Sequence, residues 1–356
     1  MKIIQVNLGN RSYPIQVKSG LMQEFPAILK KNNHGQKWVI ISQNNLMELF
    51  GFKLMDHFRK LDFDIDYLTL PNSEAAKSIN EFNKVINQMI KMNCDRSTII
   101  LALGGGVVGD VAGFVASSFM RGINYYQIPT TLLAMVDSAI GGKTGINFTE
   151  GKNLVGAIYQ PKGVLIDPKF LNTLPKEELI SGLSEVIKYG AIWDREFFDQ
   201  VSQWLDEFDS FPFEKAVHRS CEIKAEIVSE DEREDGLRKI LNFGHTIGHA
   251  VEAHLEYRGI RHGEAVALGM KCAGWISREI GTIDKDDEDY LIQTIEKLSL
   301  DSIPKLDTNT ILSFVKRDKK VKNSILHFVI LDKIGFAKIS KSITDDLIKK
   351  SLKVIQ

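Results

Sequence analysis

Three histidines lie close together in one part of the sequence. His245 and His249 are four residues apart, and His262 follows shortly after them. Neutral imidazole is the commonest metal-binding side chain, and residues four apart face the same side of a helix. Because the chain has only eight histidines, this clustering indicates a metal site more than a set of packed or surface histidines. Spacing alone leaves open whether His245 or His249 binds the metal. His254 is better explained as an ordinary packed or surface histidine.

A catalytic zinc-type site has three protein ligands and one open position. We expect the third ligand to be a carboxylate from another element, and Glu185 is the best candidate. It lies in the middle of a largely apolar helical stretch, where an unpaired carboxylate is costly to bury. The alternative is an ordinary surface pair with Lys188, which lies three residues later on the same helix face.

A glycine-rich turn forms a second candidate site. It follows the continuous apolar strand 97–103 and leads into an apolar helix at 111–118. Free N–H groups at the positive end of a helix dipole attract anions, so this arrangement predicts a phosphate-binding site. The turn matches G-x-G-x-x-G at Gly104, Gly106 and Gly109. No acidic residue closes a second strand about 20 residues further on, which predicts a dinucleotide site of a variant kind; a purely structural turn is the alternative.

Residues 129–156 add a second glycine-rich region, which we expect to form loops held by a scaffold. Its glycines let the chain approach a ligand closely, while Lys143 and Lys152 offer cationic donors for phosphate. If the other cations of the chain converge on them, a nearly neutral protein would have a pocket for a small anionic substrate. These further residues are Lys188, Lys224, Arg238, Lys319 and Lys320, together with the amide of Asn242.

Composition limits the classes of protein to consider. A chain of 356 residues predicts two domains. The net charge of -1 gives no general attraction to nucleic acid or anionic membranes. The three cysteines are scattered, which excludes a disulfide framework and a Cys-rich zinc site. The start of the chain lacks the apolar core of a signal peptide, and no run approaches the roughly 18 apolar residues of a membrane span. We therefore expect a cytoplasmic protein.

The periodicity of apolar residues changes along the chain. The first half predicts strands at 37–42, 65–70, 97–103 and 164–167 and a helix at 78–92, the alternation of an α/β domain. The second half predicts helices at 175–193, 213–229, 242–255, 263–280 and 285–298, one hairpin at 325–339, and a solvated charged loop at 229–235. We place the boundary at Pro168–Lys169, which gives an α/β domain 1–168 and a mainly helical domain 169–356.

Together and in this order, the segments 104–110, 129–134, 141–147, 184–188, 241–249 and 262–266 resemble the 3-dehydroquinate synthase family. The resemblance implies an N-terminal Rossmann-like NAD-binding α/β domain and a mainly α-helical C-terminal metal-binding domain, assembled as a homodimer. It implies a lyase of the shikimate pathway, and hence of aromatic amino acid and chorismate biosynthesis. The reaction would convert 3-deoxy-D-arabino-heptulosonate 7-phosphate to 3-dehydroquinate and phosphate. The implied cofactors are NAD and a divalent metal, usually zinc, with cobalt possible.

The implied reaction starts with transient oxidation of a substrate hydroxyl by NAD, while the metal acts as a Lewis acid on that oxygen. Phosphate then leaves by β-elimination, the ketone is reduced again, and an intramolecular aldol step closes the ring. Positioning and electrostatics account for much of the protein's task. No dedicated strong base is required, and His249 would shuttle a proton.

The resemblance also implies roles for individual residues. Glu185, His245 and His262 would bind the metal, and His249 would serve the phosphate region of the substrate. The implied substrate residues are Arg121, Lys143, Lys152, Asn153, Lys188, Lys224, Arg238, Asn242 and Lys319, the last favoured over Lys320 for the substrate carboxylate. The implied NAD contacts are Glu74, Lys77, Gly105, Gly106, Val107, Val108, Gly109, Asp110, Thr130, Thr131, Asp137, Lys143, Lys152, Phe170, Leu171 and Thr173. Gln43 departs from the family, which usually has an aspartate there near the adenosine ribose.

Three other functions remain open from the sequence. A sibling sugar-phosphate cyclase that makes an inosose or a valiolone would share the fold and cofactors, but Lys224, Arg238 and Asn242 favour a substrate that carries both carboxylate and phosphate. A metal-dependent polyol dehydrogenase would release NADH during turnover. A non-enzymatic binding or scaffold protein would lack tightly bound NAD and stoichiometric metal.

Overall fold

The computed structural model describes residues 2–30, 36–149, 151–256, 258–301, 304, 306–321 and 326–356. The chain divides into two compact units. Unit 1 holds residues 1–174 and 224–233, and unit 2 holds residues 175–223 and 234–356. The predicted limits 1–168 and 169–356 refer to cofactor-binding and metal-binding functions, and they stay a prediction.

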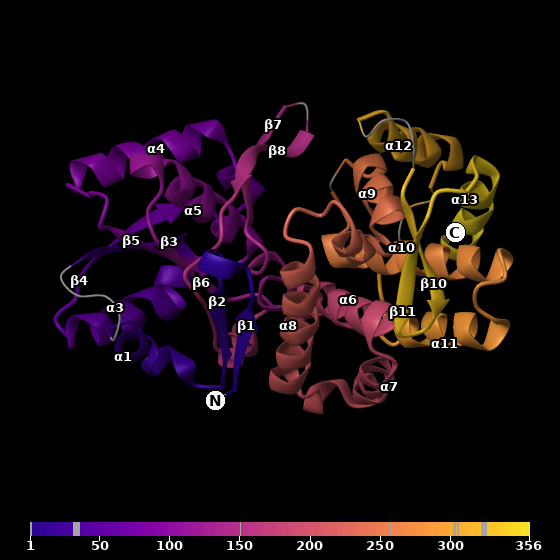
Figure 1. Ribbon diagram of the computed structural model, residues 1–356, viewed down its shortest axis with the longest axis horizontal. Helices are drawn as coiled ribbons and strands as arrows, with labels where there is room; N and C mark the ends of the chain where they lie inside the picture. Colours follow the sequence, from indigo (N-terminus) through magenta and orange to yellow (C-terminus); the bar gives the residue numbers. More distant parts are fainter. Residues whose placement is uncertain are drawn as a thin grey trace. The chain divides into compact units, whose positions relative to one another are not determined.

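Unit 1 is built on a sheet (Figure 1), in which the described residues form seven strands in the order β1-β2-β9-β6-β5-β3-β4. The strands are β1 (Lys2–Val6), β2 (Tyr13–Val17), β3 (Lys37–Gln43), β4 (Asp64–Leu70), β5 (Ile99–Gly104), β6 (Tyr125–Pro129) and β9 (Val164–Ile166). Only the pair β1–β2 is antiparallel among these pairings. All four predicted strands are confirmed within a residue or two. Strands β3, β5 and β9 are buried almost throughout, as expected inside a sheet that is covered on both faces, whereas the edge strand β4 alternates between buried and more exposed residues.

Helices cover both faces of this sheet. Side chains alternate between faces along a strand, so Val39 and Ile41 of β3 pack on one side with α4 (Ile79–Lys91) and α5 (Gly106–Ser118). On the other side Trp38 meets Phe58 of α3 (Phe52–Arg59), with ring centroids 5.8 Å apart. Figure 1 shows these two helical layers, the second also containing α1 (Phe25–Lys30). The short α2 (Asn44–Leu46) precedes α3 in the chain. The carboxyl end of β5 and the turn that follows it therefore lie between two packed helical layers.

The second part of the second glycine-rich region is a hairpin, so the prediction of loops is wrong from Lys143 onward, whereas residues 139–141 do form turns and bends. Strands β7 (Lys143–Phe148) and β8 (Gly151–Ile158) pair antiparallel, with Gly145 opposite Gly156. A Cβ at Gly156 would stand 1.9 Å from the carbonyl oxygen of Thr144, so the two backbones approach each other in a way that only glycine permits. The same glycines that indicated loops are therefore needed for strand pairing.

Unit 2 is mainly helical. It contains α6 (Lys176–Trp193), α7 (Arg195–Trp204), α9 (His245–His254), α10 (His262–Glu279), α11 (Lys285–Glu296), α12 (Thr308–Val321) and α13 (Asp345–Ser351), with the hairpin β10 (Phe328–Lys333) and β11 (Phe336–Ser340). Helix α8 (Phe213–Glu230) is divided between the two units. The predicted helices and hairpin are confirmed, with one correction.

That correction concerns the helix predicted at 242–255. The α-helix begins at His245, and residues Leu237–Asn242 form the separate 3₁₀ helix η9. Gly244 ends the continuity because its φ is +81°, a left-handed conformation in which glycine carries no steric penalty. In the described part of the chain, no helix combines the length and the apolar character that crossing a membrane requires.

Candidate functional site

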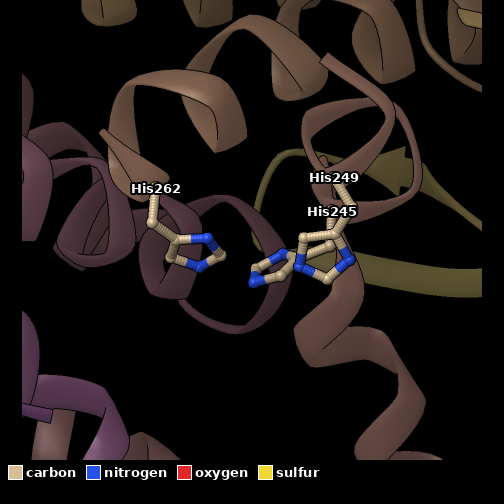
Figure 2. Close-up of side chains that lie close together, drawn as sticks. All are labelled: His245, His249 and His262. Carbon is tan, nitrogen blue, oxygen red and sulfur yellow. The ribbon is translucent and has the colours of Figure 1, made fainter. Parts of the chain in front are cut away.

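The three histidines of the sequence motif converge. His245 begins α9, His249 follows one turn later, and His262 is the first residue of α10. One ring nitrogen of each lies within 4.8 Å of those of the other two. Figure 2 shows the three side chains extending toward one another from the two helices. Imidazole groups at this separation can share one metal ion.

Glycines bring the helices of this cluster into close contact. A Cβ at Gly269 of α10 would stand 1.9 Å from the carbonyl oxygen of Gly244, just before α9. A Cβ at Gly248 of α9 would stand 2.9 Å from the carbonyl oxygen of Ala265. Separations below 3 Å leave no room for a side chain, so the approach of α9 to α10 depends on these glycines.

Glu185 lies beside the imidazoles, on α6. Its side chain is 0% exposed, and its Oε1 lies 3.5 Å from Nε2 of His245 and 3.8 Å from Nε2 of His262. Its Oε2 forms an ion pair with Lys188. Oε1 accepts no hydrogen bond from any described residue. An unsatisfied buried carboxylate oxygen costs more than the roughly 1–3 kcal/mol of a neutral group, so the donor set fits a cation placed between Oε1 and the two nitrogens.

The surface pair proposed as the alternative for Glu185 and Lys188 is wrong. Both side chains are buried, with Lys188 1% exposed. A buried ion pair does not by itself indicate function. Here, however, Lys188 contacts only one of the two carboxylate oxygens, and the other faces the histidines.

His245 is held in its neutral form. Its Nδ1 lies 3.2 Å from the carbonyl oxygen of Phe243. A carbonyl only accepts hydrogen bonds, so the proton belongs on Nδ1 and the lone pair on Nε2, toward Glu185. Burial, followed by the charge of Lys188, lowers the pKa of His245 well below its ordinary value.

His262 and His249 differ in what surrounds them. Nδ1 of His262 lies 3.2 Å from Oε2 of Glu252, and its side chain is 32% exposed. The side chain of His249 is exposed, unlike that of His245, which is 12% exposed. Geometry thus allows His249 as a further ligand, while its exposure suits contact with a substrate.

The glycine-rich turn of unit 1 has the form of an anion site. Helix α5 begins at Gly106 after Gly105, with no side chain capping it. A Cβ at Gly106 would meet the hydroxyl of Ser138 at 3.0 Å, and one at Gly109 would meet the carboxamide of Gln127 at 2.8 Å. The hydroxyls of Thr130 and Ser138 are buried without a hydrogen-bond partner among the described residues. The glycines therefore serve close packing of the chain, and the orphaned hydroxyls show polar capacity left for a ligand.

A polar network links the hairpin β7–β8 to this turn. Buried Lys77 donates to Oδ2 of Asp110 at 2.6 Å and contacts the carboxamide of Asn153. Asn147 accepts from the backbone N–H of Asn153 at 2.8 Å and donates to Glu74 at 2.7 Å. Burial raises the pKa of Asp110 above its ordinary value, against the opposing charge of Lys77. The predicted cofactor residues Glu74, Lys77 and Asp110, from two separate segments, are thus joined to the predicted substrate residue Asn153 in one network.

The segment 229–235, predicted as nothing more than a solvated charged loop, has structural contacts. Helix α8 extends through Glu230. Glu232 pairs with Arg11 at 2.7 Å and accepts from Gln160 at 2.9 Å, and its side chain is only 11% exposed. Glu234 accepts from the carboxamide of Asn242 at 2.5 Å. Charged side chains of this segment therefore form contacts inside their own unit, Glu232 in unit 1 and Glu234 in unit 2.

Comparison with known proteins identifies the family. The models of the 3-dehydroquinate synthase N-terminal and C-terminal families match residues 67–181 and 182–321. A curated 3-dehydroquinate synthase from Rippkaea orientalis is 42% identical over 354 residues, which cover 98% of this chain and 97% of that protein. The chain belongs to the 3-dehydroquinate synthase family. It is a lyase that converts 3-deoxy-D-arabino-heptulosonate 7-phosphate to 3-dehydroquinate and phosphate.

Solved structures agree with this family at the level of the fold. A 2-deoxy-scyllo-inosose synthase, complexed with carbaglucose-6-phosphate, NAD⁺ and Co²⁺, has a TM-score of 0.88 and 26% identity, and the match covers 100% of both chains. The 2-epi-5-epi-valiolone synthase of Streptomyces hygroscopicus, with NAD⁺ and Zn²⁺ bound, has a TM-score of 0.86 and 25% identity, and the match covers 96% of both chains.

The remaining residues implied by the family resemblance lie in varied surroundings. In unit 1, Lys143, Lys152 and Arg121 are exposed, and Lys224 donates to the carboxylate of Asp137 at 2.7 Å. Phe170 and Leu171, in η7 (Pro168–Thr173), are buried, whereas Thr173 is exposed. In unit 2, Arg238 is buried. The side chains of Lys319 and Lys320 lie outside the described residues. Gln43, the departure from the family, donates to the carbonyl of Pro71 at 3.1 Å.

Reasoning from the sequence missed several polar residues of the site. Glu252, Asn147, Ser138 and Glu234 were not expected to contribute. Asn147 belongs to the motif 141–147 and was within reach of that signal. The surroundings of the other three depend on contacts between segments that no spacing rule specifies.

Proposed function

We propose that Glu185, His245 and His262 hold a divalent metal ion in unit 2 and that unit 1 holds NAD for the reaction of the family. One observation carries the metal site: within the described part of the chain, the buried Oε1 of Glu185 accepts no hydrogen bond, yet it lies 3.5 and 3.8 Å from two imidazole nitrogens. Two nitrogens and one carboxylate oxygen are the ligands of catalytic zinc, with a position left open.

Zinc is the metal that we propose, with cobalt as a functional substitute. A nitrogen-rich set with one carboxylate suits both ions and disfavours magnesium or calcium, which prefer oxygen. The two solved relatives support this choice, since one contains Co²⁺ and the other Zn²⁺. We also propose a homodimeric, cytoplasmic enzyme, which sedimentation and cell fractionation would test.

The NAD site is supported by the features of the turn before α5. Among the residues that the structure describes, no side chain caps this helix and the buried hydroxyls of Thr130 and Ser138 have no hydrogen-bond partner. Glu74, Lys77 and Asp110 lie in one network. The N-terminus of the helix would face the pyrophosphate. When bound, NAD supplies a hydride acceptor that later returns the hydride, and the metal supplies a Lewis acid at the oxidised oxygen.

The chain's own residues then bind and orient the substrate. The residues that the family resemblance assigns to the substrate would neutralise its phosphate and carboxylate or form hydrogen bonds with them. The cations are Arg121, Lys143, Lys152, Lys188, Lys224, Arg238 and Lys319, and the hydrogen-bonding partners are Asn153 and Asn242. His249 is exposed, so its ring nitrogens can exchange protons with substrate and solvent. Neutral His245 keeps its Nε2 lone pair free for coordination, because Nδ1 faces the Phe243 carbonyl.

Phosphate release from 3-deoxy-D-arabino-heptulosonate 7-phosphate tests this proposal. We expect release to stop when a chelator removes the metal and to return on addition of Zn²⁺ or Co²⁺. Glucose 6-phosphate and sedoheptulose 7-phosphate, the substrates of sibling cyclases, serve as controls and should give no phosphate. Activity that survives complete chelation would contradict the metal assignment.

A further inference from the structure

We propose that Glu252 is a positioning residue, which orients His262 through a hydrogen bond so that its Nε2 can bind the metal. This inference rests on the proposed metal site and extends it to a residue that is itself no ligand. The observation is a distance of 3.2 Å between Oε2 of Glu252 and Nδ1 of His262.

Glu252 is a buried carboxylate, and burial of such a group calls for a polar partner. It is 6% exposed, and buried carboxylates are rare unless they are paired. Along α9, His245, His249 and Glu252 stand at intervals of four and three residues, so they share one helix face. That face carries two imidazoles and a carboxylate toward the start of α10, where His262 lies.

The chemistry of the contact fixes the state of the ring. A carboxylate only accepts hydrogen bonds, so Nδ1 of His262 carries the proton and Nε2 keeps its lone pair. That Nε2 lies 3.8 Å from Oε1 of Glu185. A carboxylate behind a metal-binding histidine fixes its tautomer and orientation and raises its basicity as a ligand.

The two histidines differ in how this orientation is achieved. For His245 the acceptor is the backbone carbonyl of Phe243, which the fold itself fixes. For His262 the acceptor is a side chain, and the ring is more exposed, at 32% against 12%. Substitution of Glu252 can therefore remove the orienting acceptor without altering the backbone.

Glu264 provides a matched control. It is 8% exposed and lies two residues after His262 on the same helix. Its Oε2, however, accepts from the backbone N–H of Arg261 at 2.7 Å, which caps α10. E264Q removes a buried negative charge near His262 while leaving the contact of its ring with Glu252 in place.

The test measures Zn²⁺ affinity of the full-length protein by competition with a chromophoric chelator, for wild type, E252Q, E252A and E264Q. Loss of a carboxylate behind a ligating histidine typically weakens metal binding by about 10- to 100-fold. We expect that loss in E252A, a smaller one in E252Q because its carbonyl oxygen still accepts, and less than about 3-fold in E264Q. The visible spectrum of bound Co²⁺ should change in the Glu252 variants, which reports the coordination directly.

The outcomes separate the inference from the proposed site. Unchanged Zn²⁺ affinity and Co²⁺ spectrum in both E252Q and E252A would overturn the positioning role, while the metal site would stand. If the wild-type protein binds no Zn²⁺, or if the variant H262A binds Zn²⁺ as tightly as wild type, the proposed metal site is wrong and this inference falls with it. Thermal unfolding of each metal-free variant identifies a folding defect, and if E252A is unfolded, E252Q decides.

Discussion

Gly263 of α10 lies directly against the backbone of Ser181 in α6, although 82 residues separate them in the chain. A Cβ at position 263 would stand 1.9 Å from the carbonyl oxygen of Ser181. The N–H of Gly263 also donates to the hydroxyl of Ser181 at 3.1 Å. This contact joins the helix that begins with His262 to the helix that carries Glu185, one turn beyond Ser181.

Gly263→Ala should therefore disturb both stability and metal binding. The added methyl group must push α10 away from α6, and overpacking of this kind costs about 1–3 kcal/mol. We expect a lower melting temperature and weaker Zn²⁺ binding, measured by calorimetry and chelator competition. Gly151→Ala is the control, because the three atoms nearest to its methyl group would all belong to the side chain of Leu154, at 3.3 Å or more. Equal behaviour of the two variants would contradict this role for Gly263.

The buried pair of Glu185 and Lys188 leads to a prediction for the metal-free protein. Both side chains are at most 1% exposed. Removal of one partner leaves a buried charge uncompensated, which costs about 3–5 kcal/mol. E185Q should lower the free energy of unfolding by that order, and the double variant E185Q/K188M should recover most of it, as chemical denaturation would show. If the double variant were less stable than E185Q alone, the unpaired charge of Lys188 would not be the cause of the stability lost in E185Q.

Much of the candidate metal site could be predicted, because the energetic cost of burying a charged side chain can be argued for a single residue. A carboxylate in an apolar helix needs a partner, and this identified Glu185 without knowledge of the fold. The turn after 97–103 followed from an apolar strand and a helix on either side of glycines. These signals are local, and the structure confirms the elements that carry them.

The rest of the fold and of the candidate site could not be predicted. It depends on contacts between residues that are distant in the sequence, or on glycines that could serve either a loop or a close strand pairing. Glu252 meets His262 only because α9 packs against α10, and no pattern states that contact. The hairpin β7–β8 was missed because close backbone pairing and a mobile loop both favour glycine. The helix predicted from residue 242 was too long since the conformation of Gly244 is a property of the folded chain.

The low pKa of His245 predicts how the metal-free enzyme responds to acid. Burial lowers this pKa well below its value in the unfolded chain, so below about pH 6.5 the unfolded state takes up a proton that the folded state refuses. Stability from this group is present above that pH and falls as the pH decreases, by at most about 1.4 kcal/mol per pH unit. Urea unfolding between pH 5 and pH 7.5 should show a shallower decline in H245Q than in wild type. If the free energy of unfolding declined equally with pH in the two proteins, His245 would not be the source of the acid sensitivity.

Asn147 should govern the order of the hairpin that carries Asn153. Its carboxamide accepts from the N–H of Asn153 and donates to Glu74, at 2.8 and 2.7 Å, so one side chain fastens the hairpin to the segment that holds Lys77. Asn147→Ala removes both bonds, each worth about 1 kcal/mol, and NAD affinity measured by calorimetry should fall by roughly tenfold. Asn147→Asp keeps the acceptor but places a negative charge against Glu74, so it should weaken binding at least as much. Asn87→Ala, which removes one surface amide contact on α4, should leave NAD affinity unchanged. If Asn147→Ala binds NAD as tightly as wild type, the network does not position the cofactor residues.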